Sequence, residues 1–198
     1  MMLVKRRLQH EHQYRAHLFD YPSHRGTLDD NARSLAEFMA VEEFDSVHLV
    51  AHSLGGVVAL RMLALEPEAP VHRVVCLGSP LCGSRAASRL TRTEWGNTIL
   101  GKSVTAGVVG DAAHRWAREV CESRDVGVIA GTVPIGMGRL VTSFDEDNDG
   151  TVAVSETRLP GLKDHLCLPV SHTGLLLSKN VADQTAAFLQ RGEFLRDT

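Results

Sequence analysis

Short apolar runs and longer amphipathic segments alternate along most of the chain. Nearly continuous apolar runs lie at residues 47–51, 71–77, 125–131 and 165–170, and a shorter one lies at residues 16–19. A strand that is buried on both faces carries such a run instead of a polar–apolar alternation. Each run therefore predicts a strand, and the strands together predict a parallel sheet.

The segments between these runs have the spacing of helices. The apolar run after Ser53 is long enough for a buried helix that ends at Glu66-Pro67, and Thr27 with Asp30 has the pattern of a capping box. The apolar positions that share one face are Leu28, Ala32, Leu35, Phe38 and Met39 in the helix after Thr27, and Val181, Thr185, Phe188 and Leu189 in the last helix. The basic, His-rich residues 1–13 predict a weak surface helix. We therefore expect an α/β fold, with a mostly parallel sheet covered by helices on both faces, in one domain over residues 1–198.

Composition narrows the class of protein. The 198 residues carry a formal net charge of −3, which argues against a nucleic-acid partner. No apolar run is long enough for an integral membrane segment, and the N-terminus lacks the apolar region of a signal peptide. The four cysteines have no metal-ligand spacing, so we expect buried free thiols in a cytoplasmic protein. The sequence does not indicate an oligomeric state.

The residues around Ser53 form the most informative motif. Ala51-His52-Ser53-Leu54-Gly55 is a variant of the G-x-S-x-G pattern and lies between a predicted strand and a predicted helix. Such a sharp turn holds the serine exposed, and it needs small residues two positions to either side. The alternative is a helix start that Ser53 caps, with glycines that allow close packing.

This stretch resembles the nucleophile elbow of the α/β-hydrolase family, in particular its lipase and esterase branch, where His-Ser-Leu-Gly-Gly is a frequent form. Residues 78–84, Gly-Ser-Pro-Leu-Cys-Gly-Ser, are similar to the turn after the next strand in lipases. Residues 149–152, Asp-Gly-Thr-Val, are similar to the loop that carries the acid in many lipases. The resemblance begins at the first predicted helix and covers nearly everything that follows.

The resemblance implies a role for each of three residues. Ser53 would be the nucleophile, His172 the general base and then acid, and Asp149 the acid that orients His172. They occur in the family's order, and Asp149 and His172 each follow a predicted strand. The backbone N–H of Leu54 would contribute to the oxyanion hole.

Other residues compete for these roles. His52 adjoins the nucleophile, but the family usually uses a histidine there structurally, and His165 would lie at the wrong end of its strand. Asp145 and Asp147 could replace Asp149, although neither precedes the Gly-Thr-Val segment.

The acidic loop 145–156 also matches the calcium-binding pattern D-x-D-x-D-G-x₅-E, whose ligands here would be Asp145, Asp147, Asp149, Thr151 and Glu156. Glycines and prolines on both sides argue against the helix pair that an EF-hand needs. Calcium is therefore an alternative to the expectation that the protein needs no cofactor. The two roles compete, since an Asp149 bound to calcium could not orient His172.

One part of the family pattern is absent. The second oxyanion donor comes from a His-Gly loop after an early strand, and no His-Gly dipeptide precedes Ser53. In the family's sheet this strand lies between the strand ending near Asp20 and the strand before Ser53. We therefore expect a fold without that strand, which reflects either a truncated N-terminus or a rearranged fold with impaired activity.

The function implied is a carboxylic ester hydrolase of the lipase or esterase type, acting on small-molecule or lipid esters. An acyltransferase would use the same three residues. The alternative outside the enzymes is a protein without catalytic activity, either hydrolase-like or calcium-binding. Residues 85–124 have poor periodicity and occupy the place of a cap or lid insertion in the family.

Overall fold

A sheet of four parallel strands forms the centre of the molecule in a computed structural model of the chain, which describes residues 1–21, 26–42, 44–82, 111–135 and 146–196. Its order is β1 (Val47–His52), β2 (Val71–Leu77), β3 (Asp125–Gly131) and β4 (Asp164–Leu168), and each neighbouring pair is parallel. The parallel sheet is confirmed, with β4 shorter than the predicted 165–170. Because the strands share one direction, the loops after them meet at one rim of the sheet.

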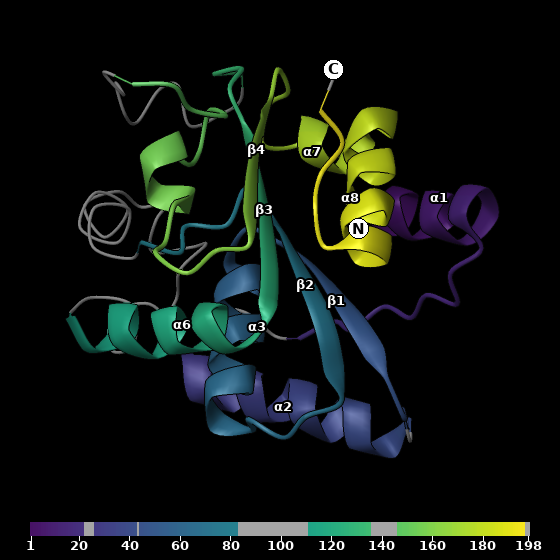
Figure 1. Cartoon of the computed structure of the whole chain (residues 1–198), viewed down its shortest axis with the longest axis vertical. Coiled ribbons are helices and arrows are strands. Elements are labelled where there is room, and N and C mark those ends of the chain that lie inside the picture. The colour runs from purple at the N-terminus through teal and green to yellow at the C-terminus, as the bar shows by residue number, and fades with distance from the viewer. Residues whose placement is uncertain (22–25, 43, 83–110, 136–145, 197–198) are drawn as a thin grey trace.

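Helices cover both faces of this sheet (Figure 1). One face packs against α2 (Leu28–Val41), α3 (Leu54–Leu65) and α6 (Asp111–Ser123). The other packs against α1 (Met2–His12), α7 (Gly174–Leu177) and α8 (Lys179–Arg191). A short 3₁₀ helix, η2 (Val154–Thr157), lies between β3 and β4. Two apolar cores result, one on each face of the sheet.

The local sequence explains where the main helices begin. In the capping box of α2, the Thr27 hydroxyl accepts the Asp30 N–H at 3.1 Å and the Asp30 carboxylate accepts the Thr27 N–H at 2.9 Å. At the start of α8, the Ser178 hydroxyl alone provides the cap and accepts the Val181 N–H. Helix α3 is apolar almost all round, because it is buried between the sheet, α2 and α6.

The helix predicted within residues 1–13 is α1, which buries Val4 and Leu8 and packs against α8. One prediction for the N-terminal region was wrong. Residues 16–19 form no strand, and β1 is the edge of the described sheet. A strand needs a neighbour that completes its hydrogen bonds, and none of the described residues provides one beside this segment.

The proposed cap region lies partly outside the described residues, which leave out 83–110. Residues 111–123 form α6, which packs on α3, and the Arg61 guanidinium lies 5.4 Å from the centre of the Trp116 ring. A lid role for 85–124 stays a prediction. The four cysteines are free as expected, but only Cys76 and Cys121 are buried, since Cys82 is partly exposed and Cys167 is exposed.

Candidate active site

Ser53 occupies a sharp turn between β1 and α3. Its φ of 54° and ψ of −128° lie in a region that residues with a side chain rarely adopt. Its N–H donates to the Leu77 carbonyl at 2.9 Å, which ties the turn to the end of β2. Such strain at one residue, held by its surroundings, is typical of a functional position.

The small residues around Ser53 are needed for close packing, but not equally. A Cβ on Gly55 would lie 3.8 Å from the Ala51 Cβ, which is an ordinary contact. A Cβ on Gly56 would lie 2.7 Å from the Ser79 Cβ and 3.0 Å from the Cys76 Sγ. The requirement for a residue without a side chain is therefore strictest at Gly56, where α3 crosses the end of β2.

Asp149 and His172 form the best-defined polar contact at this rim. The Asp149 side chain is 1% exposed, and its Oδ2 accepts a hydrogen bond from His172 Nδ1 at 2.7 Å. Its Oδ1 accepts the N–H groups of Thr151 at 2.9 Å and Val152 at 2.7 Å. Because the carboxylate accepts at Nδ1, the proton of a neutral His172 lies there and Nε2 keeps a free lone pair.

The backbone holds this pair in place beside the end of β2. The His172 N–H donates to the Asp149 carbonyl at 2.8 Å. A Cβ on Gly78 would lie 2.9 Å from Asp149 Oδ2 and 3.2 Å from His172 Nδ1, and Gly78 has a φ of +55°. Gly78 directly follows Leu77, whose carbonyl accepts the Ser53 N–H. The three predicted residues therefore gather around one strand end, although Ser53 Oγ makes no hydrogen bond to His172 within the described part of the chain.

His52 links the Ser53 turn to the loop of His172. Its Nε2 donates to the His172 carbonyl at 3.1 Å, and the two ring centres are 4.5 Å apart. Burial, together with the neighbouring His172, lowers the pKa of His52 to about 4, so the ring is neutral at physiological pH. The sequence indicated a structural histidine here, and the structure identifies its contact.

Leu54 is the first residue of α3. The N–H groups in the first turn of a helix have no acceptor within the helix. The Leu54 N–H, immediately after Ser53, has no backbone acceptor among the described residues, and its part in an oxyanion hole stays a prediction.

The alternative calcium ligands do not converge in the described residues, which leave out Asp145. Both oxygens of Asp149 are engaged as above, Glu156 is buried with its Oε2 on the Ala153 N–H at 3.0 Å, and Asp147 is exposed. The end of the loop forms the short 3₁₀ helix η2, where an EF-hand begins its second α-helix. The loop's geometry favours the role of orienting His172, and calcium binding stays a prediction.

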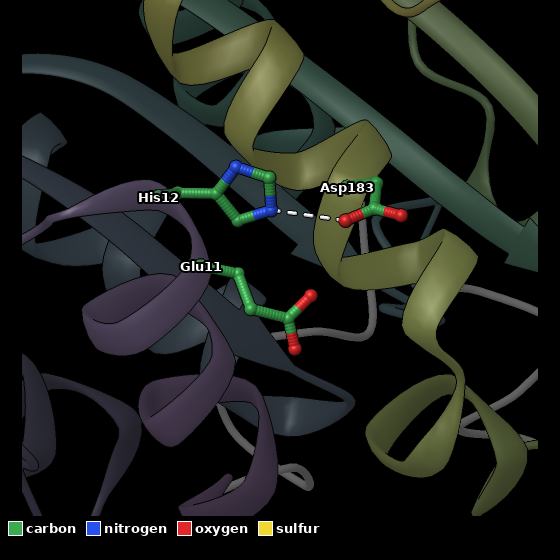
Figure 2. Close-up of side chains that lie close together, drawn as sticks. All are labelled: Glu11, His12 and Asp183. Carbon is green, nitrogen blue, oxygen red and sulfur yellow. Dashed lines mark hydrogen bonds and ion pairs between the residues drawn. The ribbon is translucent and has the colours of Figure 1, made fainter.

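A second polar cluster joins α1 to α8 (Figure 2). The ligand atoms of Glu11, His12 and Asp183 lie within 4.8 Å of one another, and His12 Nε2 contacts Asp183 Oδ1 at 2.9 Å. The Lys179 ammonium also lies 3.0 Å from Glu11 and 2.9 Å from Asp183. Since the Lys179 ammonium already forms ion pairs with both carboxylates, the cluster is explained as a link between two helices.

A parallel sheet covered by helices on both faces, with the candidate residues in the loops at one rim, is typical of enzymes with an α/β fold. A family profile described as the Alpha/beta hydrolase family matches residues 2–190, and the chain therefore belongs to that family. No curated protein matches the sequence significantly.

Solved structures with the same fold include lipases. The mature lipase BlEst2 of Bacillus licheniformis is 20% identical over 88% of this chain and 77% of its own, with a TM-score of 0.65. The product of the lin2722 gene of Listeria innocua is 16% identical over 98% of this chain and 88% of its own, with a TM-score of 0.61.

A phospholipase shares the fold as well. The phospholipase PlaB of Legionella pneumophila is 16% identical over 96% of this chain and 51% of its own, with a TM-score of 0.61. At these identities the likeness establishes the fold. None of the helices in the described parts of the chain is both long and apolar enough to span a membrane.

Proposed function

We propose that the protein cleaves carboxylic esters through an acyl-enzyme on Ser53. The observation that carries the proposal is the 2.7 Å bond between His172 and the buried Asp149, at the strand end to which Ser53 is tied. A carboxylate in this position fixes the imidazole with its second nitrogen free to accept a proton. The family and its lipase neighbours support the same assignment.

Each residue then has a defined part in the reaction. Ser53 Oγ attacks the ester carbonyl carbon while its proton passes to His172 Nε2, and the Leu54 N–H donates to the oxyanion. The protonated His172 returns this proton to the departing alkoxide, which leaves as an alcohol. A water molecule then loses a proton to His172 and attacks the acyl group, and Ser53 is regenerated with release of the acid. Asp149 stays ionised throughout and stabilises the imidazolium.

The family and the named neighbours support a proposal for the substrate class. We infer small-molecule or lipid esters, since two of the neighbours are described as a lipase and a phospholipase. Acyl transfer to an alcohol in place of water would use the same three residues. The source of a second oxyanion donor is open in this chain, and loss of one such donor costs about two to three orders of magnitude in rate.

A fluorophosphonate probe tests the proposal, because it reacts with activated serines. We expect labelling of the wild type that is lost in Ser53→Ala and kept in Ser46→Ala, a control at the opposite end of β1. Folding of each variant is checked by circular dichroism. Equal labelling of Ser53→Ala, or a folded wild type that neither labels nor hydrolyses p-nitrophenyl esters, would contradict it.

A further inference from the structure

Three adjacent basic residues of α1 have no partner for their charges. Lys5, Arg6 and Arg7 follow one another in this helix, and no carboxylate of the described residues forms an ion pair with any of them. The exposed Arg33 and Arg118, on the opposite face of the sheet, each pair with a carboxylate of their own helix instead. The positive charge of α1 is therefore not compensated within the described part of the fold.

The three cations share the outer side of the helix. Helix α1 lies at the side of the molecule against α8, and its buried residues are Val4 and Leu8 (Figure 1). With about 100° of rotation per residue, Arg6 lies opposite this buried stripe, and Lys5 and Arg7 lie on its two flanks. Arg6 is exposed and the other two are half-exposed, as this geometry requires. We call Lys5, Arg6 and Arg7 the basic face of α1.

The side chains on this face enclose a surface hollow. Its volume is about 290 Å³, and it is lined by Leu3, Arg6, Arg7, His10 and Glu11. Arg7 uses Nη1 to donate to the Leu177 carbonyl at 2.7 Å, which fixes its guanidinium and leaves its other N–H groups for a ligand. Guanidinium groups suit phosphate oxygens, because their planar donors match the spacing of two oxygens. The hollow therefore has the chemistry of a site for a phosphate group.

Two exposed apolar side chains adjoin the basic face. Met2, four residues before Arg6 and thus on the same side of α1, is 69% exposed. Leu177, whose carbonyl holds Arg7, is 57% exposed. Cations beside exposed apolar side chains are typical of membrane surfaces, where the cations meet the headgroups and the apolar groups enter the boundary with the acyl chains. A soluble polyanion would gain nothing from Met2 and Leu177, so the combination favours a lipid surface.

The rest of the molecule sets the orientation of such a contact. The chain carries a net charge of −3, so an anionic surface attracts it only where the local charge is positive. Charges interact over about 8 Å at physiological ionic strength. Near the basic face, Glu11 and Asp183 (Figure 2) are both paired with the Lys179 ammonium. The favoured approach therefore brings α1 to the surface, together with α7, which packs against α1 and begins two residues after His172.

We propose that the basic face of α1 docks on an anionic lipid bilayer, with its cations on the headgroup phosphates and with Met2 and Leu177 in the boundary between headgroups and acyl chains. Helix α1 keeps its buried side on α8 throughout, so docking requires no unfolding of the helix. The attraction is electrostatic and therefore weakens as the salt concentration rises. The proposal does not depend on the function of Ser53, and its tests use no measurement of activity.

Sedimentation with lipid vesicles gives the first test. We expect binding to vesicles of phosphatidylglycerol and phosphatidylcholine in equal parts, and none to phosphatidylcholine alone. Lys5→Gln combined with Arg6→Gln should weaken binding about fivefold for each charge, or about 25-fold. The control, Arg33→Gln combined with Arg118→Gln, removes the same charge from the opposite face and should bind within about twofold of the wild type. Equal loss in the two folded variants, or no binding by the wild type, would overturn the proposal.

A second test distinguishes a lipid surface from a soluble anion. Leu177→Ser should weaken binding to the same vesicles about fivefold or more, because the leucine no longer leaves water, and should leave binding to heparin unchanged. The control is Val41→Ser, which changes an apolar side chain that is 80% exposed at the end of α2 and should keep full vesicle binding. Unchanged vesicle binding by Leu177→Ser, or displacement of the wild type by millimolar inorganic phosphate at constant ionic strength, would assign the basic face to a soluble anion and overturn the proposal.

Discussion

The chemistry proposed for this protein depends on one buried carboxylate. Asp149 uses Oδ1 to order its own loop and Oδ2 to hold His172, so neither oxygen is left to solvent or to another ligand. The two tasks are linked, because the loop that supplies the acid is shaped by the acid itself. A substitution can separate these two tasks if it keeps the side-chain oxygen that orders the loop and replaces the oxygen that holds His172.

In Asp149→Asn, the amide oxygen can keep the two backbone N–H groups, while the NH₂ group faces His172. His172 must then present an unprotonated Nδ1, which places its proton on Nε2 and removes the base for Ser53. We expect kcat on p-nitrophenyl esters to fall about 10⁴-fold, with Tm changed by only a few degrees. A fall of less than tenfold in the folded variant would refute the role given to Asp149.

His52 provides a second residue-scale prediction. Leucine in its place loses the bond to the His172 carbonyl, whereas glutamine keeps a donor of similar reach. We expect His52→Leu to lower kcat about tenfold with little change in KM, and His52→Gln to recover part of the loss. Steady-state kinetics of the two variants distinguish this positioning role from simple packing, for which leucine would be the better replacement.

Among the elements, α3 has the strictest packing. It begins at the strained Ser53, and Gly56 places its backbone against Ser79 and Cys76 at the end of β2. The position of the helix therefore fixes the position of the turn. Any outward movement of α3 would carry Ser53 and the Leu54 N–H with it.

Two glycine variants test this contact. Gly56→Ala should reduce the free energy of unfolding by about 1–3 kcal/mol, since its Cβ cannot fit without movement of α3 or β2. Gly55→Ala should be neutral or stabilising by up to about 1 kcal/mol, because its Cβ meets only an ordinary contact and alanine favours the helix. Urea unfolding measures both. Equal stability of the two variants would show that the close approach at Gly56 is not real.

The elements that could be predicted from the sequence are those that depend on residues close together along the chain. The strands at 71–77 and 125–131 are visible because both faces are buried, and the capping box because its partners are three residues apart. The strand predicted at residues 16–19 was wrong, since an apolar run does not reveal whether a partner strand is present. The His52–His172 contact spans 120 positions, and no local pattern indicates it.

At the scale of the whole molecule, the parallel sheet explains how distant loops come together. Ser53 follows β1, Asp149 lies in the connection between β3 and β4, and His172 follows β4. Their order along the chain could be predicted from the resemblance, and their approach to one another follows from the common direction of the strands. What the sequence could not supply is the packing of the rim, which depends on Gly78 and His52.

Two partly buried histidines predict how stability varies with pH. Burial lowers the pKa of both His52 and His165 to about 4, from an ordinary value of 6.5. The unfolded chain therefore binds more protons between these values, and stability falls as the pH decreases from about 6.5 to about 4. Thermal unfolding from pH 7 to pH 4.5 measures the slope, which His165→Gln should make shallower. A Tm that is constant over this range would contradict the burial of both rings.

The central claim is that Ser53 carries the acyl group during turnover. The wild type is mixed with a p-nitrophenyl ester, quenched in acid within the initial burst, and digested for peptide mass spectrometry. We predict one acylated site, on the peptide that contains Ser53, and none in His172→Ala treated in the same way. An acyl group on another residue, or turnover with no acylated peptide at any quench time, would contradict this account.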